Sequence, residues 1–330
     1  MILNKVNVVA VVISGMFMSP LMVNAGDDTK VNGFIDVIGN SDSQPVFGAD
    51  AEIDVSKKMG AVTVRVDFDA NLAANGGTSV AGGDSGRLEQ AYFAWEAMQG
   101  VTVLGGLFNS PVGQELEDAP DMDFTSHSVV WNILDGQTAL YGNNVAGVAA
   151  AGSMGPATIT LAVVDDIGLA TSGTGADVKG KTSVALVVNV DPMPGLTFEL
   201  GYVSQDDQED VTSTPTTAGN VTDINAAFNA GPVTVGLDYL LADNIVDSAA
   251  NVWAGFDVSD KLNLKVRYET VAFETSGVDD STRTTLYATF GINDNLSVAL
   301  ETSSGDNGSG EAASGIADDD VSTLEFIGTF

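Results

Sequence analysis

The sequence predicts an all-β protein: a transmembrane, antiparallel, up-and-down β-barrel of about sixteen strands. Three observations support this fold class. Apolar and polar residues alternate along segments of about 9 to 11 residues, the length of a tilted strand that crosses a bilayer. Very short turns alternate with long polar connections along the whole chain. No stretch has the apolar spacing of a long amphipathic helix.

The first 25 residues form a unit of their own. Lys5 precedes the apolar run Val6–Phe17, and Val23–Ala25 provides a cleavage site, which is the pattern of a secretory signal peptide. The run is too short for a comfortable membrane-spanning helix, and no second apolar stretch of about 18 residues follows. We therefore expect residues 1–25 to be a signal peptide and residues 26–330 to form one barrel domain.

The composition excludes several classes of protein. With 45 Asp and Glu against 12 Lys and Arg, the formal net charge is −33, so nucleic acid is not expected as a partner. A hydrophobic fraction of 44% is too high for an acidic disordered chain, and these residues must be buried or embedded in a membrane. The absence of cysteine excludes disulfides, thiolate metal sites and cysteine nucleophiles.

The connections between strands set the expected topology. Each short turn carries Gly, Pro, Asn or Asp, residues that reverse a chain at little conformational cost. Seven such turns alternate along the chain with eight long polar connections. This strict alternation is typical of outer-membrane barrels with short periplasmic turns and long external loops. The turns are Lys57–Gly60, Met98–Gly100, Ser153–Pro156, Asp191–Gly195, Ala230–Pro232, Ser259–Lys261 and Asn293–Asn295. The long connections are 41–46, 71–86, 109–137, 167–180, 205–221, 242–250, 271–281 and 304–319.

Single strands show which residues face the same side. Between residues 261 and 269, one face is apolar and the other is entirely polar or charged. The segments 47–56 and 62–69 divide in the same way. A soluble β-sandwich would show a similar alternation with its apolar faces turned inward, and it remains a third interpretation. The uniform segment length and the signal peptide favour the barrel.

Two parts of the chain resemble a known family. The last strand ends in Phe330, which resembles the C-terminal signal that Gram-negative outer-membrane proteins present to the barrel assembly machinery. The segment Gly105–Gly113, followed by an acidic stretch and by Trp131–Gly136, is similar to the β-barrel porins of the OmpL-like type. This resemblance implies a homotrimer in the bacterial outer membrane and a constriction formed by the third external loop. That loop, 109–137, is the longest of the predicted connections.

The loop 109–137 also contains the strongest concentration of charge. It holds five carboxylates within nine residues, namely Glu115, Glu117, Asp118, Asp121 and Asp123. Folded into a lumen, they would focus a negative potential and concentrate cations. The alternative is a solvated acidic surface loop. Because the loop also carries Phe124, Trp131 and other large apolar residues, we expect another part of the protein to cover it.

Basic residues on polar strand faces are candidates for the pore wall opposite this loop. They are Arg65, Lys265, Arg267 and Arg283. Facing the acidic loop, they would complete a constriction with a transverse field. The alternative is ordinary pairing with lumenal carboxylates such as Asp67 and Glu269, and both interpretations are compatible.

No catalytic residue is assigned, and no enzyme activity or cofactor is expected. His127 lies between two serines, but sequence neighbours on one loop cannot form the separate nucleophile, base and orienting group of a hydrolase. The acidic runs Asp206–Asp210, Asp279–Asp280 and Asp318–Asp320 lack an EF-hand spacing, so metal ligands remain unassigned.

The sequence therefore predicts an outer-membrane porin, a passive diffusion channel for small hydrophilic solutes and ions that prefers cations. Its expected partners are outer-membrane lipid, the barrel assembly machinery and the permeating solutes. The alternative is a closed or plugged barrel that acts as a structural outer-membrane protein or an adhesin, because a barrel does not by itself imply an open pore.

Overall fold

The computed structural model describes residues 29–41, 47–72, 87–138, 144–165, 182–205, 218–309 and 314–330. The predicted signal peptide lies outside the described residues. So do the acidic run Asp206–Asp210 and most of the connections predicted at 71–86, 167–180 and 205–221.

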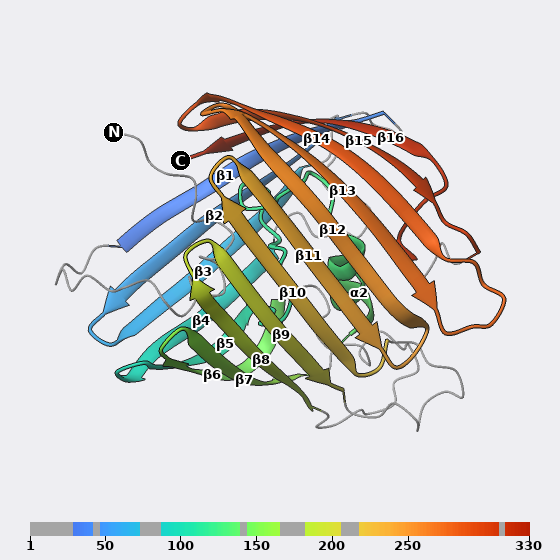
Figure 1. Ribbon diagram of the computed structural model, residues 1–330. Helices are drawn as coiled ribbons and strands as arrows, with labels where there is room; N and C mark the ends of the chain where they lie inside the picture. The colour runs from blue at the N-terminus through green and yellow to red at the C-terminus, as the bar shows by residue number, and fades with distance from the viewer. Residues whose placement is uncertain are drawn as a thin grey trace.

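In the described part of the chain, sixteen strands form one closed antiparallel barrel, which confirms the predicted fold class (Figure 1). Each strand pairs with its neighbours in sequence, and β1 pairs with β16 to close the sheet. The strands are β1 (Thr29–Asn40), β2 (Phe47–Met59), β3 (Val62–Leu72), β4 (Arg87–Met98), β5 (Val101–Asn109), β6 (Asn144–Met154), β7 (Ala157–Asp165), β8 (Thr182–Met193), β9 (Leu196–Ser204), β10 (Val221–Ala230), β11 (Val233–Ala242), β12 (Val246–Ser259), β13 (Leu262–Phe273), β14 (Ser281–Asn293), β15 (Leu296–Asp306) and β16 (Asp320–Thr329).

The short turns lie where the sequence predicts them. At one end of the barrel, each of the seven connections from an even-numbered strand to the next strand has only two residues. Five of these turns contain a glycine with a positive φ, between 61° and 81°, a conformation that other residues adopt at a cost. These glycines are Gly60, Gly100, Gly155, Gly195 and Gly231.

One predicted connection is much shorter than expected. The prediction of a polar loop at 242–250 is wrong, because only residues 243–245 separate β11 from β12. Val246 and Ala249 are buried inside the barrel and belong to β12. Their polar neighbours Asp247 and Ser248 give the segment the composition of a loop, although it has the alternation of a strand. The connection predicted at 271–281 is likewise reduced to residues 274–280.

Many large apolar side chains of the strands point outward and are exposed on the outer surface. On β3, the side chain of Phe68 is 52% exposed, whereas Asp67 beside it is completely buried. A water-soluble sandwich would bury the apolar face, so the third interpretation of the sequence is wrong. An apolar outer surface with polar groups inside is the arrangement that a bilayer requires.

In the described part of the chain, one short helix interrupts the all-β pattern. Helix α2 (Val129–Gln137) follows β5 in the chain, and Figure 1 shows it within the ring of strands. The sequence analysis expected no long helix and did not predict this short one. No helix in the described part of the chain has the length and mean hydropathy needed to cross a bilayer.

The barrel contains an apolar core on its inner side. Val129, Val130, Ile133 and Leu134 of α2 are buried in one cluster with inward-facing side chains of β5–β13. On this side of the barrel the inner wall is apolar, with Phe108 of β5, Val145 of β6 and Val164 of β7 in the cluster. The wall is therefore the partner that covers the apolar residues of the acidic loop, as the sequence analysis expected.

Candidate functional site

The candidate site is the connection between β5 and β6, of which residues 110–138 are described. We call these residues the inward segment. Their polar contacts reach the inner faces of β6, β9 and β13–β16, so the segment crosses the interior of the barrel (Figure 1). The structure thus places the predicted loop 109–137 inside the barrel.

A side chain packed directly on a glycine fixes the start of the inward segment. Val112 is buried against Gly201 of β9, where an added Cβ would lie 2.5 Å from a methyl carbon of Val112. The amide of Gly113 then donates a hydrogen bond of 3.0 Å to Glu199 on the same strand. A glycine at position 201 is therefore required for the segment to turn inward at this point.

Local hydrogen bonds organise the turn that leads into α2. Ser128 caps the helix, because its Oγ accepts a hydrogen bond of 3.1 Å from the amide of Trp131. His127 stacks on the Trp131 ring with 3.5 Å between ring centroids, and its Nδ1 lies 2.7 Å from Glu115 Oε1. Burial alone would raise the pKa of Glu115, but the contacts with His127 and the nearby Arg267 lower it below its usual value.

The cap gives a first testable prediction. Ser128→Ala should destabilise the folded barrel by about 1 kcal/mol, the usual effect of removing a serine cap. Thermal unfolding in detergent measures this change, and Ser128→Thr is the matched control because threonine also caps helices and adds no charge beside Glu115. An equal loss in both variants would contradict the capping role.

Carboxylates of the barrel wall hold the inward segment by accepting its backbone hydrogen bonds. The amide of Val129 donates to Glu269 at 2.8 Å, and the amide of Thr125 donates to Glu301 at 2.9 Å. The hydroxyl of Thr125 donates to Glu325 at 2.7 Å. The segment is thus fixed to β13, β15 and β16 through buried, charge-assisted hydrogen bonds.

Three of the four predicted basic wall residues bind the same part of the segment. Arg267 donates to the carbonyl oxygen and the hydroxyl of Ser126, at 2.8 and 2.7 Å. Arg283 donates to the carbonyl oxygen of His127 at 2.6 Å, and Lys265 pairs with Asp123. Both arginines also pair with the buried carboxylate of Glu269, so the two interpretations of these residues hold together.

Arg65, the fourth predicted basic residue, lies on another part of the wall. It belongs to β3 and pairs with Asp67 at 2.6 Å and Asp54 at 3.1 Å. Its charge also acts on the nearby Asp118 and Asp121 of the inward segment. Arg65 therefore forms ion pairs with carboxylates of β2 and β3, whereas the other three basic residues lie together on β13 and β14.

The five predicted acidic residues do not form one cluster. Glu115 turns toward His127, Glu117 accepts a hydrogen bond from Asn144, and Asp123 pairs with Lys265. Asp118 and Asp121 lie near other carboxylates, and Arg65 acts on both from beyond ion-pair distance. Burial and the neighbouring Glu89 raise the pKa of Asp118 to about 7.

A recess remains between the inward segment and the wall. It is lined by side chains of both, including Asp121 and Asp123 from the segment and Asp238, Asn251 and Arg267 from β11–β13. Carboxylates outnumber basic groups among these residues. A space of this kind offers oxygen ligands to a passing cation.

Sequence reasoning missed the wall carboxylates that carry the segment. Glu199, Glu301 and Glu325 were not singled out, although each lies on the polar face of its strand. The alternation could have placed them inside the barrel. It could not have paired them with a loop up to 200 residues away in the chain.

Comparisons with known proteins agree with this architecture. An engineered porin from Rhodopseudomonas blastica with two introduced tryptophans superimposes with a TM-score of 0.60 at 14% sequence identity, covering 92% of this chain and 100% of that one. A variant of the same porin with four charged residues replaced by alanine gives 0.58 at 15% identity, with the same coverage. At these identities the likeness shows the fold alone. A search of functionally curated proteins gave no match.

The sequence itself matches one family over most of its length. The profile described as "Putative beta-barrel porin-2, OmpL-like" covers residues 24–300, which include β1–β14 and the whole inward segment. Together with the closed sixteen-stranded barrel, this match confirms the resemblance noted in the sequence and the predicted location. The chain belongs to the OmpL-like family of β-barrel porins and is an outer-membrane porin.

Proposed function

We propose that this porin is a passive diffusion channel that prefers cations and that the inward segment forms its constriction. The observation that carries the proposal is the charge of the inner wall. Among the described charged residues that are buried, nine are carboxylates and one is the guanidinium of Arg267. They all belong to strands. The carboxylates are Asp36, Glu52, Asp67, Glu199, Asp223, Asp238, Glu269, Glu301 and Glu325.

The basic residues of the lumen offset only part of this charge. Lys265, Arg267 and Arg283 are occupied by Asp123, Glu269 and carbonyl oxygens of the inward segment. A negative potential between low-dielectric walls raises the local concentration of cations and lowers that of anions. Selectivity then depends on the sign of the fixed charge, without a dedicated binding site for one solute.

The selectivity is tested by neutralising two carboxylates that line the recess. Asp121→Asn with Asp238→Asn should move the reversal potential in a KCl gradient toward zero. At a distance of about 8 Å in water, each charge contributes about 0.5 kcal/mol, so the permeability ratio should fall about two-fold per charge. Neither side chain is required for a hydrogen bond that holds the segment to β13–β16.

The control removes two carboxylates outside the lumen. Asp279 and Asp280 are exposed in the connection before β14, so Asp279→Asn with Asp280→Asn should leave the reversal potential unchanged. An anion-selective wild type would contradict the preference for cations. Equal shifts in both double variants would remove the recess as its origin.

One observation favours the second candidate, a closed or plugged barrel. The apolar cluster around α2 fills the space between the helix and β5–β13, which leaves less room for water on that side. Discrete single-channel steps from folded, heat-modifiable protein support the open channel. Their absence would favour a structural or adhesive role.

A further inference from the structure

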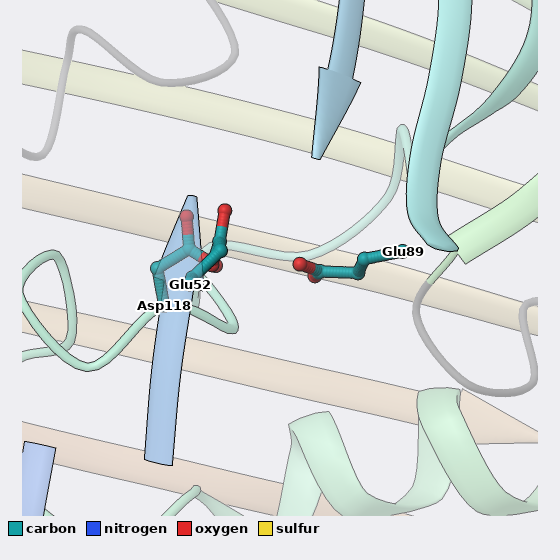
Figure 2. Close-up of side chains that lie close together, drawn as sticks. All are labelled: Glu52, Glu89 and Asp118. Atoms are coloured by element: carbon teal, nitrogen blue, oxygen red, sulfur yellow. The ribbon is translucent and has the colours of Figure 1, made fainter. Parts of the chain in front are cut away.

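Three carboxylates from distant parts of the chain meet inside the barrel. Glu52 comes from β2, Glu89 from β4 and Asp118 from the inward segment, and their oxygens approach within 4.8 Å of one another. Figure 2 shows Glu52 and Asp118 side by side, with the carboxylate of Glu89 pointing toward them. Two of these residues belong to the wall and one to the segment that crosses the lumen.

Glu52 is buried, and one of its carboxylate oxygens has no hydrogen-bond partner. Its side chain is only 3% exposed, and its Oε1 accepts no hydrogen bond. The nearest basic atom paired with it is Nη2 of Arg65, 4.0 Å away. An ionised carboxylate in such a position is unfavourable unless a cation or several donors compensate for the lost hydration.

A second group of carboxylates on the same strands shows how such a cost is met. Glu52, Asp54 and Asp67 also lie within 4.8 Å of one another, and Arg65 is their cation, at 2.6 Å from Asp67 and 3.1 Å from Asp54. In the group formed with Glu89 and Asp118, Arg65 reaches only Glu52, at 4.0 Å. Arg65 acts on Glu89 and Asp118 only through longer-range attraction, and neither carboxylate forms an ion pair with a basic side chain that the structure describes.

Hydrogen bonds hold the acidic groups close together in spite of their like charges. The side-chain amide of Asn144 donates to Glu89 at 3.2 Å and to Glu117 at 3.1 Å, so it links wall and segment next to Asp118. The second oxygen of Glu89 has no hydrogen-bond partner. Carboxylates fixed at this separation repel one another strongly where the dielectric constant is low.

We propose that Glu52, Glu89 and Asp118 bind a divalent cation of the calcium class, which fastens the inward segment to the β2–β4 side of the wall. The donors are all carboxylate oxygens, without histidine or cysteine, which selects hard cations over transition metals. Three separate elements supply them, and lumenal water can complete the six to eight ligands that Ca²⁺ takes.

This site would complete the attachment of the segment around the barrel. On the β13–β16 side, the wall offers Arg267 and Arg283 to carbonyl oxygens, and Glu301 to backbone amides. On the β2–β4 side, carboxylate faces carboxylate. A bound cation turns that repulsion into attraction. The proposal concerns how the segment is held and does not depend on which ions the pore prefers.

The test is calorimetric titration of the full mature protein in detergent, first stripped with a chelator and then titrated with CaCl₂ or MgCl₂. We expect saturable binding of one Ca²⁺ per chain, tighter than Mg²⁺. Glu52→Gln and Asp118→Asn should each weaken it by at least about ten-fold, since even changes in groups that only support metal ligands reach that size. Asp279→Asn with Asp280→Asn, which removes two exposed carboxylates, should leave it unchanged.

Folding is checked separately by heat-modifiable migration on gels. If Glu52→Gln does not fold, Asp118→Asn provides the same test from the lumenal segment. Ca²⁺ should also raise the thermal midpoint of the wild type but not that of Asp118→Asn. Absence of saturable binding, or equal binding in the wild type and the folded variants, would overturn the site. Because no bilayer is involved, this result is independent of the selectivity measurement.

Discussion

Replacing Arg267 by methionine is expected to destabilise the folded barrel by about 3–5 kcal/mol and to raise its single-channel conductance. Arg267 is 1% exposed, and it donates two hydrogen bonds to Ser126 while pairing with Glu269 at 3.1 Å. Its guanidinium also lies 4.5 Å from the centre of the Phe124 ring. Methionine keeps much of the volume but supplies no donor, so the segment loses its attachment at residues 124–127.

Two measurements check this result: thermal unfolding in detergent and conductance in planar bilayers. Lys30→Met is the matched control, because Lys30 lies exposed on β1 and its loss removes one positive charge from the wall without touching the inward segment. If the Arg267 variant kept the conductance and the unfolding midpoint of the control, Arg267 would not be an anchor of the segment.

The second large effect is expected from Ile133→Asp. Ile133 is completely buried in the apolar cluster between α2 and the wall. Removing a buried isoleucine side chain typically costs about 2–5 kcal/mol, and a carboxylate in its place must also give up its hydration. We expect α2 to leave its position, with a lower unfolding midpoint and a larger, noisier conductance.

The neighbouring residue provides the control for this change. Asn132→Asp introduces the same carboxylate one position earlier in α2, outside the apolar cluster, and should leave both measurements nearly unchanged. Ile133→Val should cost only about 0.5–1.5 kcal/mol, since it keeps the position apolar. A variant Ile133→Asp that folds with wild-type conductance would show that α2 does not restrict the pore.

These two variants separate the polar and the apolar attachment of one segment. Arg267 acts on the β13 side, and Ile133 acts where α2 meets the wall. Both are expected to widen the lumen if the inward segment forms the constriction. A plugged barrel would instead show no steps in the wild type and would begin to conduct only when one attachment is lost.

Most of the barrel was predictable from the sequence because its signals are local. Strand faces follow from period-two alternation, as Asp67 and Phe68 show, and the two-residue turns are marked by residues such as Gly60. The connection at 243–245 was misjudged for the same local reason, because polar residues on the inner and outer faces of β12 imitate a loop.

The candidate site was predictable only in part. The sequence singled out the acidic loop and the four basic wall residues, and the structure brings Lys265, Arg267 and Arg283 against that loop. The sequence did not indicate that the five acidic residues contact different partners. It also did not indicate that a helix, α2, begins directly after Ser128. Helix α2 is short and depends on the wall to bury its apolar side, so its own sequence carries a weak signal.

The sequence by itself determined a membrane-spanning barrel, the number of its strands and the excess of negative charge. Only the tertiary structure decided which groups meet inside it. Thr125 meets Glu325 across 200 residues, and Asp118 meets Glu52 and Glu89 from three different elements. The physical reason is that the alternation of side chains along a strand places each one inside or outside the barrel. It does not specify the position of a side chain along the barrel axis or the groups that it contacts. Those depend on closure of the sheet and on the path of one segment through the lumen.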